Sequence, residues 1–410
     1  MTGARSAAVR EADAVALARA LAVRPVLCGV ARAADAIDFE GRMLLHAGPP
    51  IPDPAAMAAP VRHSAIMAIL YEGWARSGEE AGLLLDSGAV ALEPAQDHGA
   101  AIPLAEVLSE SMPVLVVEDA ANRGLRTYST VNGGNGPVMR VGLCSEEVLE
   151  RLRWVGAVLA PRLARVLEDA EIDMIDVADR ALREGDDCHG RTVAGSRLLC
   201  ERLLEAGGAA AFPAEVRAFL DDAAAFFLNP WMASVKAMMR AAEGVAGSSF
   251  VTAIGGNGVR FGLRISSRPG RWFTVEASPP LIPGRADLYG ESAGAVGDSA
   301  IVDAFGCGAM AAAAYAPQTW ERIRQTCAEH RLAFPVDLLS APHPAFGRAT
   351  ALRTGLTVQR ALALSQTPVI SLGVLDGSGA RGRFDGGFYF SPAEAFERAW
   401  AELEAHDAAA

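Results

Sequence analysis

Hydrophobic and polar positions along this chain follow two different periods, which predict both helices and strands. Residues 114–118, VLVVE, form a nearly continuous apolar run of the kind found in buried strands. Further strands are predicted for residues 25–30, 43–46, 126–131, 250–254, 259–265, 272–276 and 367–372. Helical spacing predicts helices over residues 11–22, 64–75, 79–85, 145–159, 172–183, 191–204, 214–227, 229–242 and 392–404.

The helix predicted for residues 229–242 has recognisable start and stop signals. Asn229 suits the N-cap position, and Pro230 suits the first helical position, where a missing N–H costs nothing. Gly244 suits the stop.

A glycine-rich hairpin is predicted directly after this helix. Asn257-Gly258 is the strongest short signal for a hairpin turn. The strand that follows alternates, so one face would be apolar and the other would carry Arg260 and Arg264 around Gly262. Such a face suits a small anion, because guanidinium groups pair with carboxylate or phosphate and glycine lets a ligand approach the backbone. The alternative is an ordinary hairpin with solvated arginines.

The mixture of helix and strand patterns changes along the chain and predicts its domains. At 410 residues the chain is too long for one ordinary core. Residues 1–144 mix helices and strands, residues 145–227 are helical, and residues 228–410 return to a mixed pattern. We therefore expect an α+β (mixed α/β) fold with two mixed-sheet domains and a helical domain between them.

Composition narrows the classes of partner. Hydrophobic residues make up 51% and charged residues 21%, with a net charge of −12 and no cluster of lysines or arginines. Nucleic acid and acidic membranes are poor partners for such a chain, although a local arginine pocket could still bind a small anionic substrate. No secretion signal or membrane span is apparent, and the six cysteines show no paired spacing. These features predict a cytoplasmic protein with reduced thiols.

Two similar glycine turns are candidate oxyanion sites. The first comprises Asn132, Gly134 and Asn135 with Arg140 on a following strand, and the second is the turn at residues 255–258 before Arg260. Glycine turns present backbone N–H groups to an oxyanion. The repetition indicates either two turns around one shared site or a coincidence in a glycine-rich chain.

A third candidate combines an acid, a thiol and an imidazole. Asp187, Cys188 and His189 are followed by Arg191. Cys188 and His189 are neighbours and cannot form a nucleophile–base pair with each other. Asp187 could orient the His189 imidazole, or it could cap a helix, and His189 could contact substrate or a metal.

Two loops complete the candidates. His98 lies in a loop compatible with general acid–base chemistry or with an ordinary turn. Asp298 and Ser299 precede a helix of small residues and could cap it or contact a ligand. No zinc signature, dinucleotide loop or kinase motif is present, so we expect no metal and no cofactor.

Several stretches resemble one known family. They are LLHAGPPI (44–51), LYEGWA (70–75), TYSTVN (127–132), GDDCH (185–189), residues 226–264 and GDSAI (297–301). Together they are similar to the AllG-type family, the large subunit of oxamate carbamoyltransferase. Relatives carry acidic and lysine residues in the first glycine turn, where this chain has Gly133 and Pro137.

The resemblance implies a function in anaerobic allantoin catabolism. There, oxalurate and phosphate give oxamate and carbamoyl phosphate, with an FdrA-like partner subunit. The positions that match are Asn132, Arg140, Asp187, His189, Asn229, Asn257 and Asp298. We expect a carbamoyltransferase-like enzyme acting on a small anionic amide or ureido substrate, in a homo-oligomer. The alternatives are a non-catalytic or ligand-sensing subunit and an enzyme acting on another amide or ureido compound.

Overall fold

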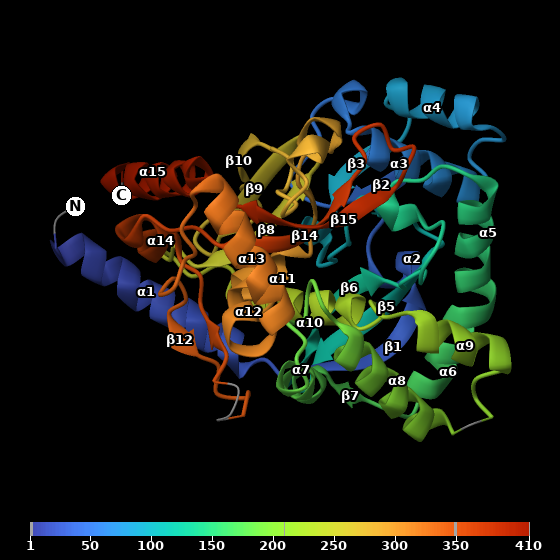
Figure 1. Cartoon of the computed structure of the whole chain (residues 1–410), viewed down its shortest axis with the longest axis horizontal. Coiled ribbons are helices and arrows are strands. Elements are labelled where there is room, and N and C mark those ends of the chain that lie inside the picture. The colour runs from blue at the N-terminus through green and yellow to red at the C-terminus, as the bar shows by residue number, and fades with distance from the viewer. Residues whose placement is uncertain (1–2, 209, 348–350, 410) are drawn as a thin grey trace.

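The computed structural model describes residues 3–208, 210–347 and 351–409 (Figure 1). Helices alternate with several small sheets, most of them antiparallel, along the whole chain. The α+β class expected from the sequence is confirmed. The domain boundaries at residues 144 and 227 stay a prediction. None of the helices in the described ranges is both long enough and apolar enough to cross a bilayer.

The first sheet forms around the apolar run noted in the sequence. Its four antiparallel strands are β1 (Pro25–Arg32), β5 (Pro113–Asp119), β6 (Asn122–Thr130) and β7 (Ile172–Asp173), in the order β6-β5-β1-β7. Helix α10 (Leu228–Ala241) packs on β5 and β6, while α6 (Ala160–Leu167) packs on β1. Residues 229–239 of α10 are all buried, because this helix also contacts the second sheet.

The second sheet contains the predicted hairpin. Its strands are β8 (Val251–Asn257), β9 (Arg260–Ile265), β10 (Phe273–Glu276) and β11 (Val296–Gly297), in the order β10-β9-β8-β11. A third sheet, in the order β3-β2-β4, contains β2 (Met43–His46), β3 (Ala91–Pro94) and β4 (Val107–Leu108). The two-stranded pairs are β12 (Ala341–Pro342) with β13 (Arg353–Thr354), and β14 (Val369–Leu375) with β15 (Arg383–Phe390).

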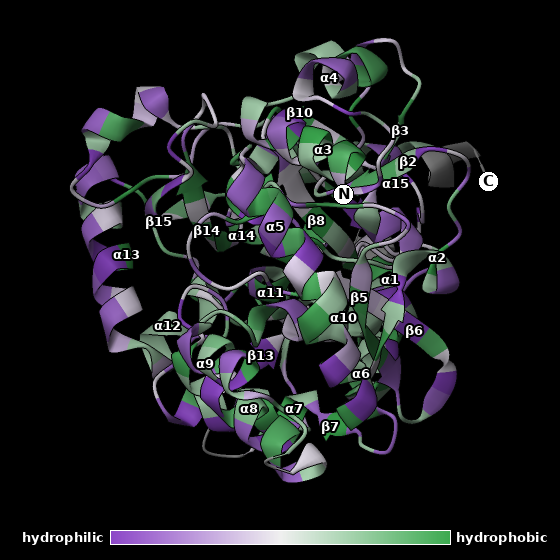
Figure 2. Cartoon of the chain, turned by 90° about the vertical axis from the view of Figure 1, so that its right-hand side faces the viewer, coloured by the Kyte–Doolittle hydropathy of each residue, from purple (hydrophilic) through white to green (hydrophobic). Residues whose placement is uncertain are grey.

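Helices cover these sheets and fill the middle of the chain. The remaining α-helices are α1 (Gly3–Ala22), α2 (Ala33–Ala36), α3 (Ala59–Tyr71), α4 (Gly78–Asp86), α5 (Glu146–Trp154), α7 (Met174–Arg183), α8 (Val193–Gly207), α9 (Ala214–Asp222), α11 (Ala300–Phe305), α12 (Ala309–Tyr315), α13 (Pro317–His330), α14 (Val358–Leu364) and α15 (Ala393–Ala409). A π-helical turn, η4 (Val155–Leu159), joins α5 to α6; the short 3-10 turns are η1 (Pro54–Ala56), η2 (Ala95–His98), η3 (Met139–Val141) and η5 (Ala286–Glu291). Figure 2 shows α10 in the middle of the molecule and the largely hydrophilic α13 along one edge.

Two local expectations from the sequence were wrong. Phe227 occupies the N-cap of α10, so Asn229 lies inside the first turn and is free to use its side chain elsewhere. Arg140 lies in the 3-10 turn η3 and not on a strand. Both differences follow from tertiary contacts of the side chains, described below.

The hairpin glycines serve chain packing rather than ligand access. A Cβ on Gly256 would overlap the carbonyl group of Ala295, and one on Gly48 would overlap the backbone of Gly256. A Cβ on Gly262 would lie 2.9 Å from the carbonyl oxygen of Phe273 on β10. These glycines let backbones of neighbouring segments approach more closely than a side chain permits.

This packing predicts a stability effect at one position. Gly256→Ala is expected to lower the free energy of unfolding by about 2 kcal/mol, because β11 must shift to admit the methyl group. Gly290→Ala is the matched control, since a Cβ at Gly290 meets no atom within 4 Å. Chemical denaturation of both variants measures the difference. Equal stabilities would contradict this account of the hairpin.

Candidate functional site

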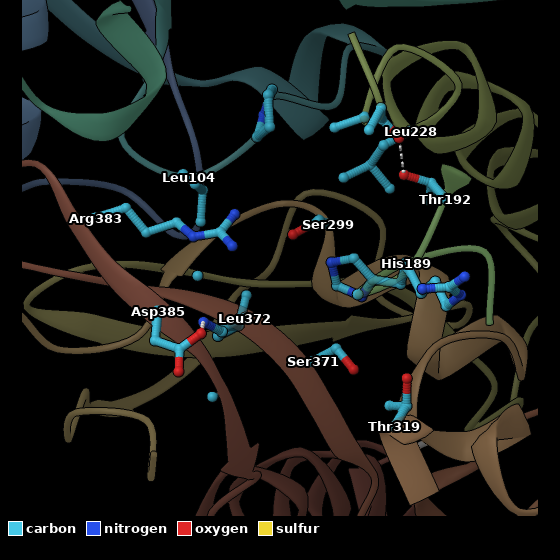
Figure 3. Close-up of a pocket in the computed structure, with 18 of the residues that line it drawn as sticks. Leu104, His189, Thr192, Leu228, Ser299, Thr319, Ser371, Leu372, Arg383 and Asp385 are labelled. Carbon is cyan, nitrogen blue, oxygen red and sulfur yellow. Dashed lines mark hydrogen bonds between the residues drawn. The ribbon is translucent and has the colours of Figure 1, made fainter. Parts of the chain in front are cut away.

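A cavity of about 450 Å³ lies where several segments far apart in the sequence meet (Figure 3). Its walls come from the first glycine turn, called below the first glycine loop (residues 132–136), and from the turn after α7. The start of α10, the start of α13 and the β14–β15 hairpin complete them. Seven of the residues singled out from the sequence line it: Asn132, Asn135, Arg140, His189, Arg191, Asn229 and Ser299. A cavity of this size suits a small-molecule site.

A histidine–aspartate pair forms one wall of the cavity. His189 Nδ1 lies 2.5 Å from Oδ2 of Asp303, which is fully buried in α11. Oδ1 of Asp303 accepts backbone N–H groups of Ala309 at 2.7 Å and Ser371 at 3.1 Å, so the carboxylate is fixed. Burial raises the pKa of Asp303, and the nearby His189 imidazole opposes that rise. Because Nδ1 is engaged, Nε2 is the nitrogen left to act on a ligand in the cavity.

Asp187 shapes the turn that carries His189. Its Oδ1 accepts the backbone N–H groups of His189 at 2.8 Å and Arg191 at 2.9 Å, and its Oδ2 accepts the hydroxyl of Thr319 at 2.8 Å. Asp186, and not Asp187, accepts a backbone N–H group near the start of α8: Gly195 N donates to Asp186 Oδ2 at 2.8 Å. An aspartate does orient the imidazole, as considered from the sequence, but the residue is Asp303. Asp187 does not line the cavity, and its carboxylate instead holds the backbone of the turn that carries His189.

Four arginines give the cavity a positive charge despite the acidic chain. Arg140, Arg191, Arg322 and Arg383 line it, against Asp385 as the lining carboxylate. Arg322 forms an ion pair with Asp385, at 3.2 Å, whereas the Arg383 guanidinium has no hydrogen bond or ion pair to any part of the chain that the structure describes. Figure 3 shows the Arg383 guanidinium directed toward the same part of the cavity as Ser299 and His189. An uncommitted guanidinium in a cavity is a ready partner for a carboxylate or phosphate.

Arg140 is held in place by the first glycine loop. Its Nη1 donates to the carbonyl oxygen of Gly134 at 2.7 Å and approaches Oδ1 of Asn132 at 3.4 Å. Burial lowers the pKa of Arg140, the nearby Glu106 opposes this lowering, and the positive charge of Arg383 acts in the same direction as burial. Two guanidinium groups that oppose each other in this way favour an anion between them.

A hydrogen bond joins Asn132 of the first glycine loop to Asn229 of α10. Asn132 Nδ2 donates to Asn229 Oδ1 at 2.9 Å, and Asn229 Nδ2 donates to the carbonyl oxygen of Thr130 at 2.9 Å. Asn135, on the rim, donates instead to the Asp222 carbonyl at 2.8 Å. The residue expected to cap α10 thus connects α10 to the glycine loop.

The hairpin arginines lie outside this cavity, contrary to expectation. Arg264 is buried, and its guanidinium forms ion pairs with Asp97 and with Glu243. Arg260 is exposed at the start of β9. His98 ends the 3-10 turn η2 and also does not line the cavity. The second glycine turn therefore does not share a site with the first.

Asn257 and Asp298 have structural contacts in place of a ligand. Asn257 Oδ1 accepts the N–H groups of the hairpin turn, and its Nδ2 donates to Pro49 O at 2.8 Å. Asp298 is fully buried and accepts N–H groups from Gly48 at 2.8 Å and Ile102 at 3.0 Å. Burial raises its pKa to about 7. Asp298 thereby fixes the turn between β11 and α11, whose residue Ser299 lines the cavity.

Several residues of the site were missed in the sequence. Asp303 had one signal, since a lone carboxylate in the apolar run AIVDAF is unusual in a core helix. Arg383 and Ser371 had none, because only the β14–β15 pairing brings them to the cavity. Leu104 lines the cavity with φ of +49°, and Cys188, before His189, has φ of +64°. Such conformations in non-glycine residues concentrate at functional sites.

Groups able to hold a metal are not gathered within the described ranges. No three histidine, cysteine, aspartate or glutamate side chains there come close enough to bind a metal ion.

Comparisons with known proteins find a matching family model and named relatives. A family model described as oxamate carbamoyltransferase subunit AllG matches residues 90–299. The chain is 33% identical over 407 residues to the Escherichia coli K12 protein named oxamate carbamoyltransferase subunit AllG, covering 95% of this chain and 96% of that protein. It is 34% identical to the Escherichia coli K12 protein YahG, over 74% of this chain and 66% of that protein.

A solved structure shows the same fold. The crystal structure of a conserved protein of unknown function from Enterococcus faecalis V583 matches with a TM-score of 0.88 and 28% identity, covering 97% of this chain and 98% of that one. With the family match over residues 90–299 and the 33% identity to the Escherichia coli protein, this chain belongs to the AllG family of oxamate carbamoyltransferase subunits.

Proposed function

We propose that the cavity is the site of carbamoyl transfer between a small anionic amide and phosphate. The observation that carries the proposal is the convergence of Arg140, Arg383 and the His189–Asp303 pair in one cavity. The arginines match the charge of oxamate, oxalurate or carbamoyl phosphate, and the histidine supplies a proton carrier. The named relative, a subunit of oxamate carbamoyltransferase, supports this substrate class.

The residues account for each bond change in the reaction. A phosphate oxygen forms a bond to the terminal ureido carbon of oxalurate, and the bond from that carbon to the oxamate nitrogen breaks. His189, held by Asp303, gives the proton on Nε2 to the leaving nitrogen and takes up the proton that hydrogenphosphate loses as its oxygen bonds to carbon. In the opposite direction, His189 Nε2 accepts a proton from the amide nitrogen of oxamate while phosphate leaves.

A hydroxyl group is available for the charge that develops during transfer. The Oγ of Ser371 is buried at the cavity wall and has no hydrogen-bond partner among the described residues. A donor of this kind, aimed at the carbonyl oxygen of the carbamoyl group, would stabilise the oxyanion of the tetrahedral intermediate.

A direct assay tests this function. The purified chain, alone and together with an FdrA-like partner subunit, is incubated with carbamoyl phosphate and oxamate, and oxalurate is measured. Formation of oxalurate that depends on this chain supports the proposal. If the partner alone produces oxalurate at the same rate, the chain is not the catalytic subunit.

A second candidate function is that of a ligand-binding subunit whose chemistry a partner completes. It is favoured by the relative's designation as a subunit and by the glycine and proline that occupy the first glycine loop. This candidate predicts anion binding by the isolated chain and turnover that is insensitive to His189. The assay above, repeated with His189→Gln, separates the two functions.

A further inference from the structure

Five polar side chains form a connected network behind the positive end of the cavity. We call it the Glu106 network: Glu106, Thr130, Asn229, Asn132 and Arg140. Thr130 Oγ1 donates to Glu106 Oε2 at 2.9 Å, and Asn229 Nδ2 donates to Thr130 Oγ1 at 3.0 Å. Asn132 connects Asn229 to Arg140, at 2.9 and 3.4 Å.

The backbone closes this network. Ala105 N donates to the carbonyl oxygen of Arg140 at 3.0 Å, which places residue 106 beside the arginine. Glu106 is buried, and Arg140 is the cation that acts on its carboxyl group. Three members, Asn132, Arg140 and Asn229, line the cavity, so the protonation state of Glu106 reaches a bound ligand through them.

We propose that Glu106 is a positioning residue that takes up a proton when an anion binds beside Arg140, and so sets how much of the arginine's charge the anion meets. This inference rests on the proposed function, because it requires an anion in the same cavity. The carboxyl group does not touch the reacting atoms in this arrangement. It acts through Arg140 and through the asparagines that Thr130 connects to it.

Ionisation of Glu106 should weaken anion binding at Arg140. Burial raises the pKa of Glu106 to about 7, while the Thr130 hydrogen bond and Arg140 oppose the rise. When the carboxyl group is neutral, the Arg140 charge is available to a ligand. When it ionises, Glu106 neutralises Arg140 and repels an incoming anion. Anion binding must therefore weaken as the pH rises above about 7, and binding must raise the pKa of Glu106 further.

Other charged or titratable groups near the Glu106 network either do not change charge near neutral pH or are the same in every variant that the test compares. On β2, His46 pairs with Val107, the residue after Glu106, and burial lowers the pKa of His46 to about 4, so it stays neutral. The positive charge of Arg383, on β15, also acts on Arg140, and Arg383 remains in every variant compared below. His189 with Asp303, and Asp186, whose pKa burial raises to about 6, remain in every variant compared below.

The test measures binding of sulfate, whose charge does not change near neutral pH. Titration calorimetry in two buffers with different ionisation enthalpies gives the affinity and the protons taken up. For the wild-type chain we expect roughly three- to tenfold weaker binding at about pH 8.5 than at about pH 6.5. Near pH 7.5 we expect about half a proton more per sulfate than for Glu106→Gln. The variant should bind sulfate at high pH about as well as the wild type does at low pH.

A second buried glutamate serves as the control for Glu106→Gln. Glu118→Gln removes another buried glutamate, on β5, and should retain both the pH dependence and the proton uptake. Equal proton uptake by the wild type and Glu106→Gln would overturn the inference and leave the anion site standing. If the wild-type chain binds no sulfate at any pH, both the inference and the anion site are wrong.

Discussion

Replacing His189 with glutamine is expected to slow carbamoyl transfer by roughly a thousandfold, with little change in the affinity for substrate. The imidazole is fixed by Asp303 at 2.5 Å, and Asp303 is itself fixed by two backbone N–H groups. Glutamine has similar size but cannot exchange a proton at neutral pH. The loss should therefore appear in kcat, because the proton transfer occurs in the transition state.

His63→Gln is the control for this change. His63 is partly buried on α3, and its Nδ1 lies 3.1 Å from the carbonyl oxygen of Gly142, outside the cavity. A glutamine there can still donate to this carbonyl group. We expect its kcat to stay near that of the wild type. A His189→Gln variant that keeps most of its activity would show that the chemistry takes place elsewhere, as a ligand-binding subunit requires.

Replacing Arg383 with methionine is expected to weaken binding of oxamate by roughly thirty- to a hundredfold. Among the described residues the Arg383 guanidinium has no partner, so its loss should leave the fold intact and act on the ligand alone. Methionine keeps most of the apolar stem, which packs near Gly373. Calorimetric titration of oxamate into the variant measures the effect.

A neighbouring arginine supplies the control. Arg381 forms ion pairs with Asp376 at 3.0 Å and Glu291 at 2.6 Å, and it does not line the cavity. Arg381→Met should bind oxamate as the wild type does. Equal losses in the two variants would mean that general charge, and not a placed guanidinium, attracts the ligand.

Local elements of this fold were predictable because local sequence determines them. The apolar run of β5 and the Asn-Gly turn after β8 appear where the sequence placed them. The helical spacing over α10 also holds, although the helix begins one residue before Asn229. In each case the signal lies within about ten residues, as secondary-structure preferences do.

The candidate site was predictable only in part, because its residues come from distant segments. Asn132 and His189 were recognised by their turns, and the structure brings both to one cavity. Asp303 is 114 residues from His189, and no spacing rule connects them. Arg264 lies on an alternating strand beside a glycine, as a ligand-binding arginine could, but its guanidinium forms ion pairs with Asp97 and Glu243. Which arginine keeps a free guanidinium depends on tertiary contacts that the sequence pattern does not contain.

We propose that Arg140 and Arg383 hold an anion between them in the cavity beside His189. A crystal structure with selenate tests it most directly, because selenium scatters anomalously and marks a tetrahedral dianion. We predict an anomalous peak between the two guanidinium groups, and its loss in Arg383→Met crystals. Peaks at exposed arginines such as Arg260, with none in the cavity, would contradict the claim.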